Sequence, residues 1–102
     1  MHESVSSRVE TALTLADEIV HILAELGVRQ AWGVIGGGCA PLAHAIGRSQ
    51  DVELIHARHE SGAAFAALEA SAVTGRPVLV FATTGPGVLN ALNGCMAARW
   101  DG

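Results

Sequence analysis

The stretch "PVLVFATT" (residues 77–84) decides the fold class, because it is a continuous apolar run rich in β-branched residues. Such a run is typical of a parallel strand that helices cover on both faces. The segment after it, "GPGVLNALNGCMAAR" (residues 85–99), predicts a helix from about Gly87 to Arg99. A strand followed directly by a helix is the unit from which parallel sheets are built.

Two further strand–helix units precede this one, and an amphipathic helix precedes them all. That first helix has apolar residues at steps of three and four, with Thr14 as its cap and Gly27 as its end. The expected strands are residues 29–35, 52–57 and 77–84, and the expected helices are residues 14–26, 40–49, 61–73 and 87–99. This order predicts an α/β protein with a three-layer α/β/α arrangement around a parallel sheet.

The composition excludes several functional classes. Half of the 102 residues are apolar, the formal net charge is −4, and the six basic residues are scattered arginines, so no basic patch indicates nucleic-acid binding. No apolar run reaches the length of a membrane span. Residues 1–10 predict a disordered lead into a cytoplasmic protein. Cys39 and Cys95 have no metal-ligand spacing, and we expect both to be reduced and buried.

Three loops that could carry chemistry each follow an expected strand. They are "GVIGGG" (residues 33–38), "RHE" (residues 58–60) and "TTGPG" (residues 83–87). Ligands of open parallel sheets bind beyond the carboxyl ends of the strands. The sequence therefore predicts that these loops lie at one edge of the sheet, where they could form one site.

Each loop also has a plainer interpretation. Gly36–Gly38 could let the backbone pass close to a ligand, or could only make a turn. Glu60 could face water at a helix start, or could be a desolvated acid with a raised pKa. "GPGVLN" is a near miss of the dinucleotide fingerprint, with Asn90 at the third glycine position, so a rigid turn beside a site is favoured over nucleotide binding.

The order and spacing of these motifs are more specific than any one of them. "ELGVRQAWGVIGGGCAPL", "ARHESGAAFAALEASAVTGRP" and "VLVFATTGPGVLNALNGCMAARWDG" resemble the N-terminal pyrimidine-binding domain of thiamine-diphosphate-dependent enzymes, in the group of acetolactate synthase-like enzymes and 2-oxo acid decarboxylases. The similarity runs from Thr11 to Gly102. It implies a flavodoxin-like parallel sheet that is incomplete in this chain, in a domain over residues 11–102 that is truncated at its C-terminal end.

The resemblance also implies a site. In this family the Glu of "RHE" hydrogen-bonds N1′ of the cofactor's aminopyrimidine ring and activates the cofactor, and the matching residue is Glu60. The other two loops are expected to contact the ring through Val34, Ile35, Gly36, Thr83, Pro86 and Asn90. No residue is expected to bind a metal. Ile35 departs from the family, because relatives commonly have Pro at this position.

The implied cofactors and partners reach beyond these residues. Thiamine diphosphate and Mg²⁺ are held in this family by a second, diphosphate-binding domain with a G-D-G…N motif that these residues do not contain. We therefore expect a homodimer or tetramer that acts on a 2-oxo acid as a lyase or transferase, by carboligation or decarboxylation. The 102-residue chain alone is expected to be inactive. Two alternatives are a non-catalytic interaction module and a Rossmann-like nucleotide binder.

Overall fold

The computed structural model describes the backbone of residues 5–102 and the side chains from residue 15 onward. The helices are α1 (Val5–Glu25), α2 (Ala40–Arg48), α3 (Glu60–Thr74) and α4 (Thr84–Asp101), and a short 3₁₀ turn, η1 (Gly37–Cys39), leads into α2. The strands are β1 (Gln30–Gly33), β2 (Glu53–His56) and β3 (Leu79–Phe81). None of the helices in this described part is long and apolar enough to cross a membrane.

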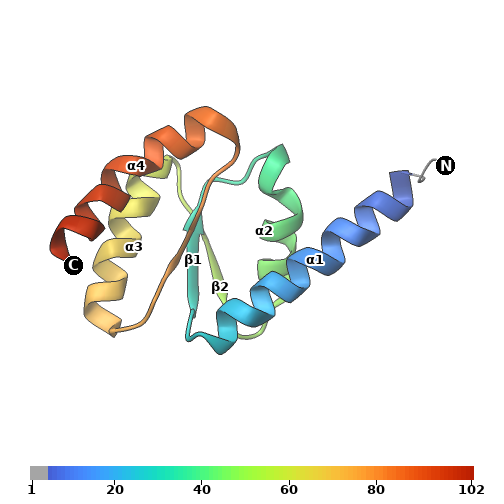
Figure 1. The fold of residues 1–102 in the computed structure, drawn as a ribbon, viewed down its shortest axis with the longest axis horizontal. Helices are drawn as coiled ribbons and strands as arrows, with labels where there is room; N and C mark the ends of the chain where they lie inside the picture. Colours follow the sequence, from blue (N-terminus) through green and yellow to red (C-terminus); the bar gives the residue numbers. More distant parts are fainter. Residues whose placement is uncertain (1–4) are drawn as a thin grey trace.

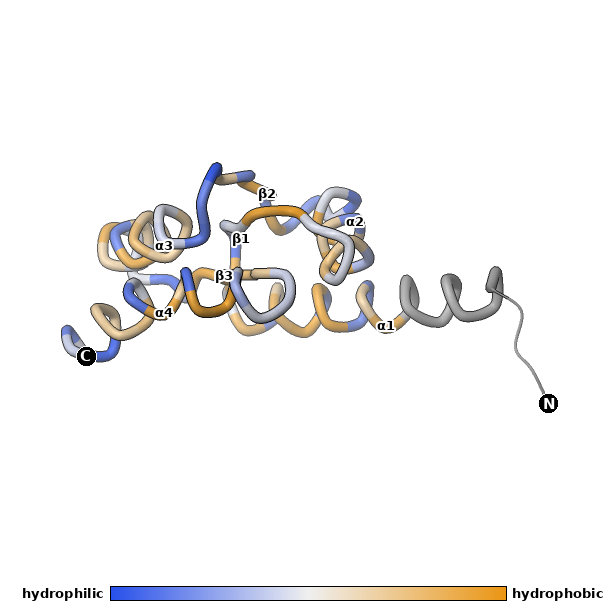
Figure 2. The backbone as a smooth tube through the Cα atoms, turned by 90° about the horizontal axis from the view of Figure 1, so that it is seen from above, coloured by the Kyte–Doolittle hydropathy of each residue, from blue (hydrophilic) through white to orange (hydrophobic). Residues whose placement is uncertain are grey.

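The three strands form one parallel sheet in the order β2-β1-β3. Figure 1 shows α1 and α2 on one face of the sheet and α3 and α4 on the other, and Figure 2 shows the same layers from above. This arrangement confirms the predicted three-layer α/β/α fold. The strand order places β1 in the centre, with β2 and β3 at the two edges.

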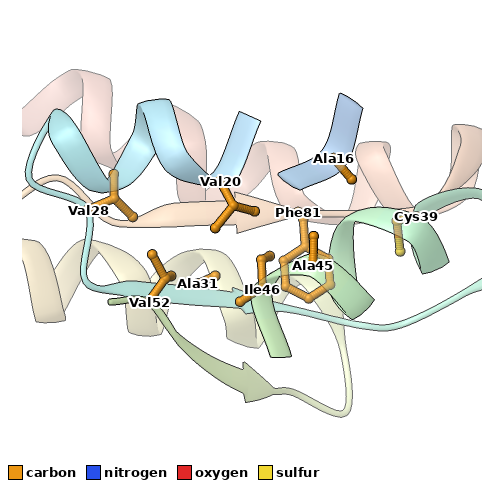
Figure 3. Packing of buried hydrophobic residues seen from close by; sticks show 9 residues of the cluster. All are labelled: Ala16, Val20, Val28, Ala31, Cys39, Ala45, Ile46, Val52 and Phe81. Atoms are coloured by element: carbon orange, nitrogen blue, oxygen red, sulfur yellow. The ribbon is translucent and has the colours of Figure 1, made fainter. Parts of the chain in front are cut away.

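The core lies mainly between the sheet and the helices α1 and α2. Ala31 on the central strand is fully buried, and Ile46 on α2 is the largest side chain with almost no exposure. Figure 3 shows the whole cluster, whose members are Ala16, Val20, Val28, Ala31, Cys39, Ala45, Ile46, Val52 and Phe81. Most of these side chains are small, so elements pack closely and each residue buries little area.

Two helices begin earlier than predicted. The first begins at Val5, so Thr14 lies inside α1 and does not cap it. Residues 5–10, which were expected to be disordered, are therefore helical, and residues 1–4 lie outside the described residues. The last begins at Thr84 and not at Gly87. Pro86 is tolerated there because the first four backbone N–H groups of a helix have no partner within the helix.

The strand that decided the fold class is less covered than expected. Its Phe81 is buried, but Leu79 and Val80 are only half-buried. The reason is its place in the sheet: β3 pairs with β1 on one side, and no strand among residues 5–102 pairs with its other side. Strand β3 therefore leaves one edge of the sheet open among the described residues.

The two cysteines differ in their surroundings. Both are free thiols, and Cys39 is buried as expected. Cys95 is exposed, so its predicted burial is wrong. Its neighbour Gly94 is the residue of α4 that faces α3, and consecutive residues of a helix point in directions about 100° apart.

Helices α3 and α4 touch at their backbones, because Gly94 has no side chain. A Cβ atom added at Gly94 would lie 2.3 Å from Ala64 Cβ and 2.8 Å from the Ala64 carbonyl carbon. Real Cβ contacts are never this short, and the second atom belongs to the backbone and cannot rotate away. The absent side chain at Gly94 therefore sets the separation of the two helices.

We expect Gly94→Ala to lower the free energy of unfolding by about 1–3 kcal/mol, because overpacking outweighs the better helix propensity of Ala. Urea unfolding followed by circular dichroism measures this change. Gly62→Ala on α3 is the matched control, since a Cβ there has no neighbour within 4 Å. Equal stabilities of the two variants would contradict the proposed close contact.

Candidate functional site

The strand register brings the three loops to the same edge of the sheet. Gly33, the last residue of β1, lies opposite His56 on β2 and opposite Phe81 on β3. The strands are parallel and end at the same level, so the segments that follow them emerge side by side. The strand pairing thus confirms the prediction that the three loops lie at one edge of the sheet.

The segment at the end of β1, residues 33–38, is called the glycine loop below, and it packs directly against the loop that follows β3. The backbone N–H of Gly38 donates to Thr83 Oγ1 at 3.1 Å. A Cβ at Gly36 would lie 2.4 Å from Thr83 Cγ2, whereas a Cβ at Gly37 would have no neighbour within 4 Å. Gly36 has φ −147°, an extended conformation that any residue adopts, so lack of space makes glycine necessary there.

The loop after β3 has one unusual backbone conformation. Thr84, the first residue of α4, has φ +50°, in the left-handed region that β-branched residues rarely adopt. Such a conformation costs about 1–3 kcal/mol and persists only where the surrounding contacts impose it. Here Thr83 is held against the glycine loop while the chain turns at once into α4.

Glu60 is the first residue of α3, and its side chain extends toward the start of α4. Asn90 Nδ2 donates to Glu60 Oε1 at 3.3 Å. The second oxygen, Oε2, lies 2.9 Å from the place that a Cβ of Gly87 would take. The residue before it, His59, caps α3, because its Nδ1 accepts from the Ser61 backbone N–H at 3.1 Å. Glu60 is half-buried in the chain.

The surroundings of Glu60 favour its charged form. A hydrogen bond from its own backbone N–H lowers the pKa of Glu60 most, Asn90 and the neighbouring His59 lower it further, and partial desolvation opposes them. The unpaired N–H groups at a helix start stabilise a carboxylate in this way. Of the two interpretations of Glu60, the structure thus favours the ionised acid at a helix start over the desolvated acid with a raised pKa, because the carboxyl is only half-buried and its own backbone N–H and Asn90 donate to it.

The lowered pKa predicts a specific pH dependence. The ionised carboxylate stabilises the fold above the ordinary Glu pKa of 4.5, and this contribution is lost as the pH falls through the lower pKa of the folded state. We expect Asn90→Ala to move the Glu60 titration midpoint upward, toward the ordinary value. Carbon-detected NMR titration measures it, with the exposed Asn93→Ala on the same helix as the control. A midpoint that Asn90→Ala leaves in place would contradict the role of the amide.

The structure joins four of the predicted site residues in two pairs. Glu60 pairs with Asn90 through a hydrogen bond, and Gly36 packs against Thr83. The two pairs come from three loops, and both involve the segment of α4: Thr83 directly precedes the helix, and Asn90 is part of it.

The other three predicted residues lie beside these pairs. Val34 is half-buried, and Ile35 and Pro86 are exposed. Sequence reasoning did not select Gly38 and Gly87, whose missing side chains make room for Thr83 and for the Glu60 carboxylate. The sequence shows that both residues belong to glycine clusters. It does not show which atoms approach them, because Thr83 and Glu60 belong to loops far away in the sequence.

The position of the Glu60 carboxylate argues against a dinucleotide at "GPGVLN". Helix starts bind diphosphates because their N–H groups and dipole favour negative charge. Here Glu60 already places a negative group against the first turns of α4, next to Gly87. A second anion at that helix start would be repelled, whereas a nitrogen heterocycle whose ring nitrogen carries a proton would be attracted.

The site is an open edge and not an enclosed cavity. A hollow of about 680 Å³ lies between α3, α4 and β3, but none of the predicted site residues lines it. Among the residues whose side chains the structure describes, no group of three or more His, Cys, Asp or Glu side chains is placed to hold a metal ion.

The comparison with known families fits this geometry. Residues 13–102 match the family model described as the thiamine pyrophosphate enzyme, N-terminal TPP binding domain. The chain belongs to this family. The match includes all three loops of the sheet edge, so the motif order in the sequence correctly indicated the family and its flavodoxin-like fold.

Several of the similar curated proteins are acetolactate synthases. The chain is 34% identical to the acetolactate synthase isozyme 1 large subunit of Escherichia coli K12, over 99% of this chain and 18% of that protein. It is 36% identical to acetolactate synthase of Bacillus subtilis, over 85% of this chain and 15% of that protein. It is 34% identical to chloroplastic acetolactate synthase 2 of Brassica napus, over 84% of this chain and 14% of that protein. The chain thus spans less than a fifth of the length of these relatives.

The contact between Gly36 and Thr83 can be tested by adding one methyl group. We expect Gly36→Ala to displace the glycine loop from Thr83, because no space exists for the Cβ. The Gly38 amide should then lose its acceptor, and its hydrogen exchange should become faster by about tenfold, the loss of a single hydrogen bond. The control is Gly37→Ala, which meets no atom within 4 Å and should leave this exchange unchanged. Equal exchange in both variants would overturn the packing argument.

Proposed function

We propose that this domain supplies the aminopyrimidine-binding half of a thiamine diphosphate site, with Glu60 as the residue that activates the cofactor. The observation that carries the proposal is the Glu60 carboxylate at the start of α3, directed toward the first turns of α4 and held there by Asn90. The membership of the chain in the thiamine pyrophosphate enzyme family supports the same assignment.

The groups present fit the aminopyrimidine ring chemically. Asn90 occupies Oε1 of Glu60, so the carboxylate keeps acceptor capacity for a ring nitrogen that carries or shares a proton. A carboxylate is suited to this exchange because it can accept and return a proton. Val34, Ile35, Gly36, Thr83 and Pro86 would form the surface beside the ring, through backbone groups and apolar atoms. When bound, the cofactor supplies the carbanion-stabilising chemistry, and the protein supplies position and the acid–base partner.

We further propose the activity of the whole protein from its relatives. Acetolactate synthases are similar over nearly the full chain, so we propose an acetolactate synthase-like lyase or transferase that acts on 2-oxo acids by carboligation or decarboxylation. Mg²⁺ and the diphosphate would be bound by a separate diphosphate-binding domain. That domain would come from a second subunit of a cytoplasmic dimer or tetramer, so this chain alone would be inactive.

Binding of the bare ring tests the domain's own share of the site. We expect 4-amino-5-hydroxymethyl-2-methylpyrimidine to shift the amide NMR signals of the three loops in the 102-residue chain. Glu60→Gln should weaken this binding, because the amide removes the negative charge that attracts the ring nitrogen. Glu69→Gln, an exposed position on the same helix, is the matched control and should bind as the wild type does.

Reconstitution tests the activating role of Glu60. With a diphosphate-binding domain from a relative, thiamine diphosphate and Mg²⁺, the wild-type chain should accelerate exchange of the C2 proton of the cofactor. Glu60→Gln should slow this exchange by about 10²–10⁴-fold, the usual contribution of a positioned acid–base group. Equal rates would remove Glu60 from the mechanism, and a failure of the ring to bind would favour a non-catalytic interaction module.

A further inference from the structure

The side chain of Cys39 lies beneath the glycine loop and contacts its backbone at three atoms. The backbone N–H of Gly36 donates to Cys39 Sγ at 3.4 Å. The thiol in turn lies 3.5 Å from the carbonyl oxygen of Gly36 and 3.7 Å from that of Val34, so its single hydrogen can be donated to either. The thiol therefore acts as acceptor and as donor toward the same short loop.

This thiol is also fixed by the core. Cys39 is 8% exposed and belongs to the main cluster of buried residues, together with Phe81 and Ala45 (Figure 3). Its own backbone N–H donates to the Gly36 carbonyl at 3.2 Å and closes the turn into α2. Because the core holds the Cys39 side chain in place, the thiol can restrict the backbone atoms of Val34 and Gly36 that it contacts.

The glycine loop needs such an anchor, because three consecutive glycines have no Cβ to restrict the backbone. Ordering a residue costs about 1–2 kcal/mol of conformational entropy, and glycine loses the most freedom on folding. Thr83 accepts a hydrogen bond only from the Gly38 end of the loop, and its contact with Gly36 is van der Waals packing. The contacts of Cys39 hold the other end, at Val34 and Gly36, which is the part assigned to the ring.

We infer that Cys39 is a positioning residue. Its thiol holds the Val34–Gly36 backbone in the position in which this backbone can pack against the aminopyrimidine ring. The inference rests on the proposed function for its binding consequence, and on the structure alone for its effect on the loop. Cys39 does not touch the ring and acts only through the loop backbone.

Three variants separate hydrogen bonding from packing. Cys39→Val keeps a buried apolar side chain, slightly larger than that of Cys, and removes the hydrogen bonds of the thiol. Cys39→Ser keeps a donor and an acceptor, and the smaller Cys39→Ala serves if the valine variant fails to fold. We expect Cys39→Val to speed hydrogen exchange at the Gly36 amide and to weaken binding of 4-amino-5-hydroxymethyl-2-methylpyrimidine, each by about three- to tenfold, the range for one lost hydrogen bond. Cys39→Ser should restore both toward the wild type.

The two readouts distinguish failure of this inference from failure of the proposed function. If the wild-type chain does not bind the pyrimidine, the proposed function fails, and exchange at Gly36 still decides the role of Cys39. Unchanged exchange at Gly36 in folded Cys39→Val would overturn the inference. So would wild-type pyrimidine affinity in that variant, because a thiol that only fills space in the core would change the unfolding midpoint and leave the affinity of the folded chain intact.

Discussion

The parallel pairing of β1 with both of its neighbours is the constraint on which the rest of the structure depends. Gly33, His56 and Phe81 lie level across the sheet, so three loops that are distant in sequence leave it together. Parallel strands require helical crossovers, and α3 is the crossover from β2 to β3. Helix α4, which follows β3, packs beside α3 on the same face of the sheet (Figure 1). The level strand ends thus bring the start of α3, with its acid, close to the start of α4, with its glycines.

The site edge is built from missing side chains as much as from present ones. Space left at Gly36 admits Thr83, and space left at Gly87 admits the Glu60 carboxylate. Such close approach makes the loops hold one another, with hydrogen bonds from Gly38 to Thr83 and from Asn90 to Glu60. At the carboxyl edge of the sheet the chain therefore presents one surface, whose loops are held by contacts within the chain.

Much of this could be predicted from the sequence, because periodicity reports local structure. The apolar run at residues 77–84 and the alternation of strands with helices gave the fold class, and the "RHE" and "GPG" motifs gave the candidate residues. The sequence left the charge state of Glu60 open between two alternatives. The largest cause of its lowered pKa, the hydrogen bond from its own backbone N–H at a helix start, is local, but the Asn90 amide comes from 30 residues away and partial desolvation depends on the fold. The burial of Cys95 was wrong for a similar reason, since the helix face that meets α3 is set by Gly94, which has no hydrophobic signal.

The backbone contact between α3 and α4 has a consequence beyond stability. Gly94 lies near the middle of α4, one turn beyond Asn90, and it meets Ala64 of α3, one turn beyond Glu60. Glu60 and Asn90 thus lie on two helices whose backbones are in contact one turn away from both residues. A change of a few tenths of an ångström in the contact between Gly94 and Ala64 would alter the distance between the Glu60 carboxylate and the Asn90 amide. Such a change would shift the pKa of Glu60 without any substitution among the residues that surround it.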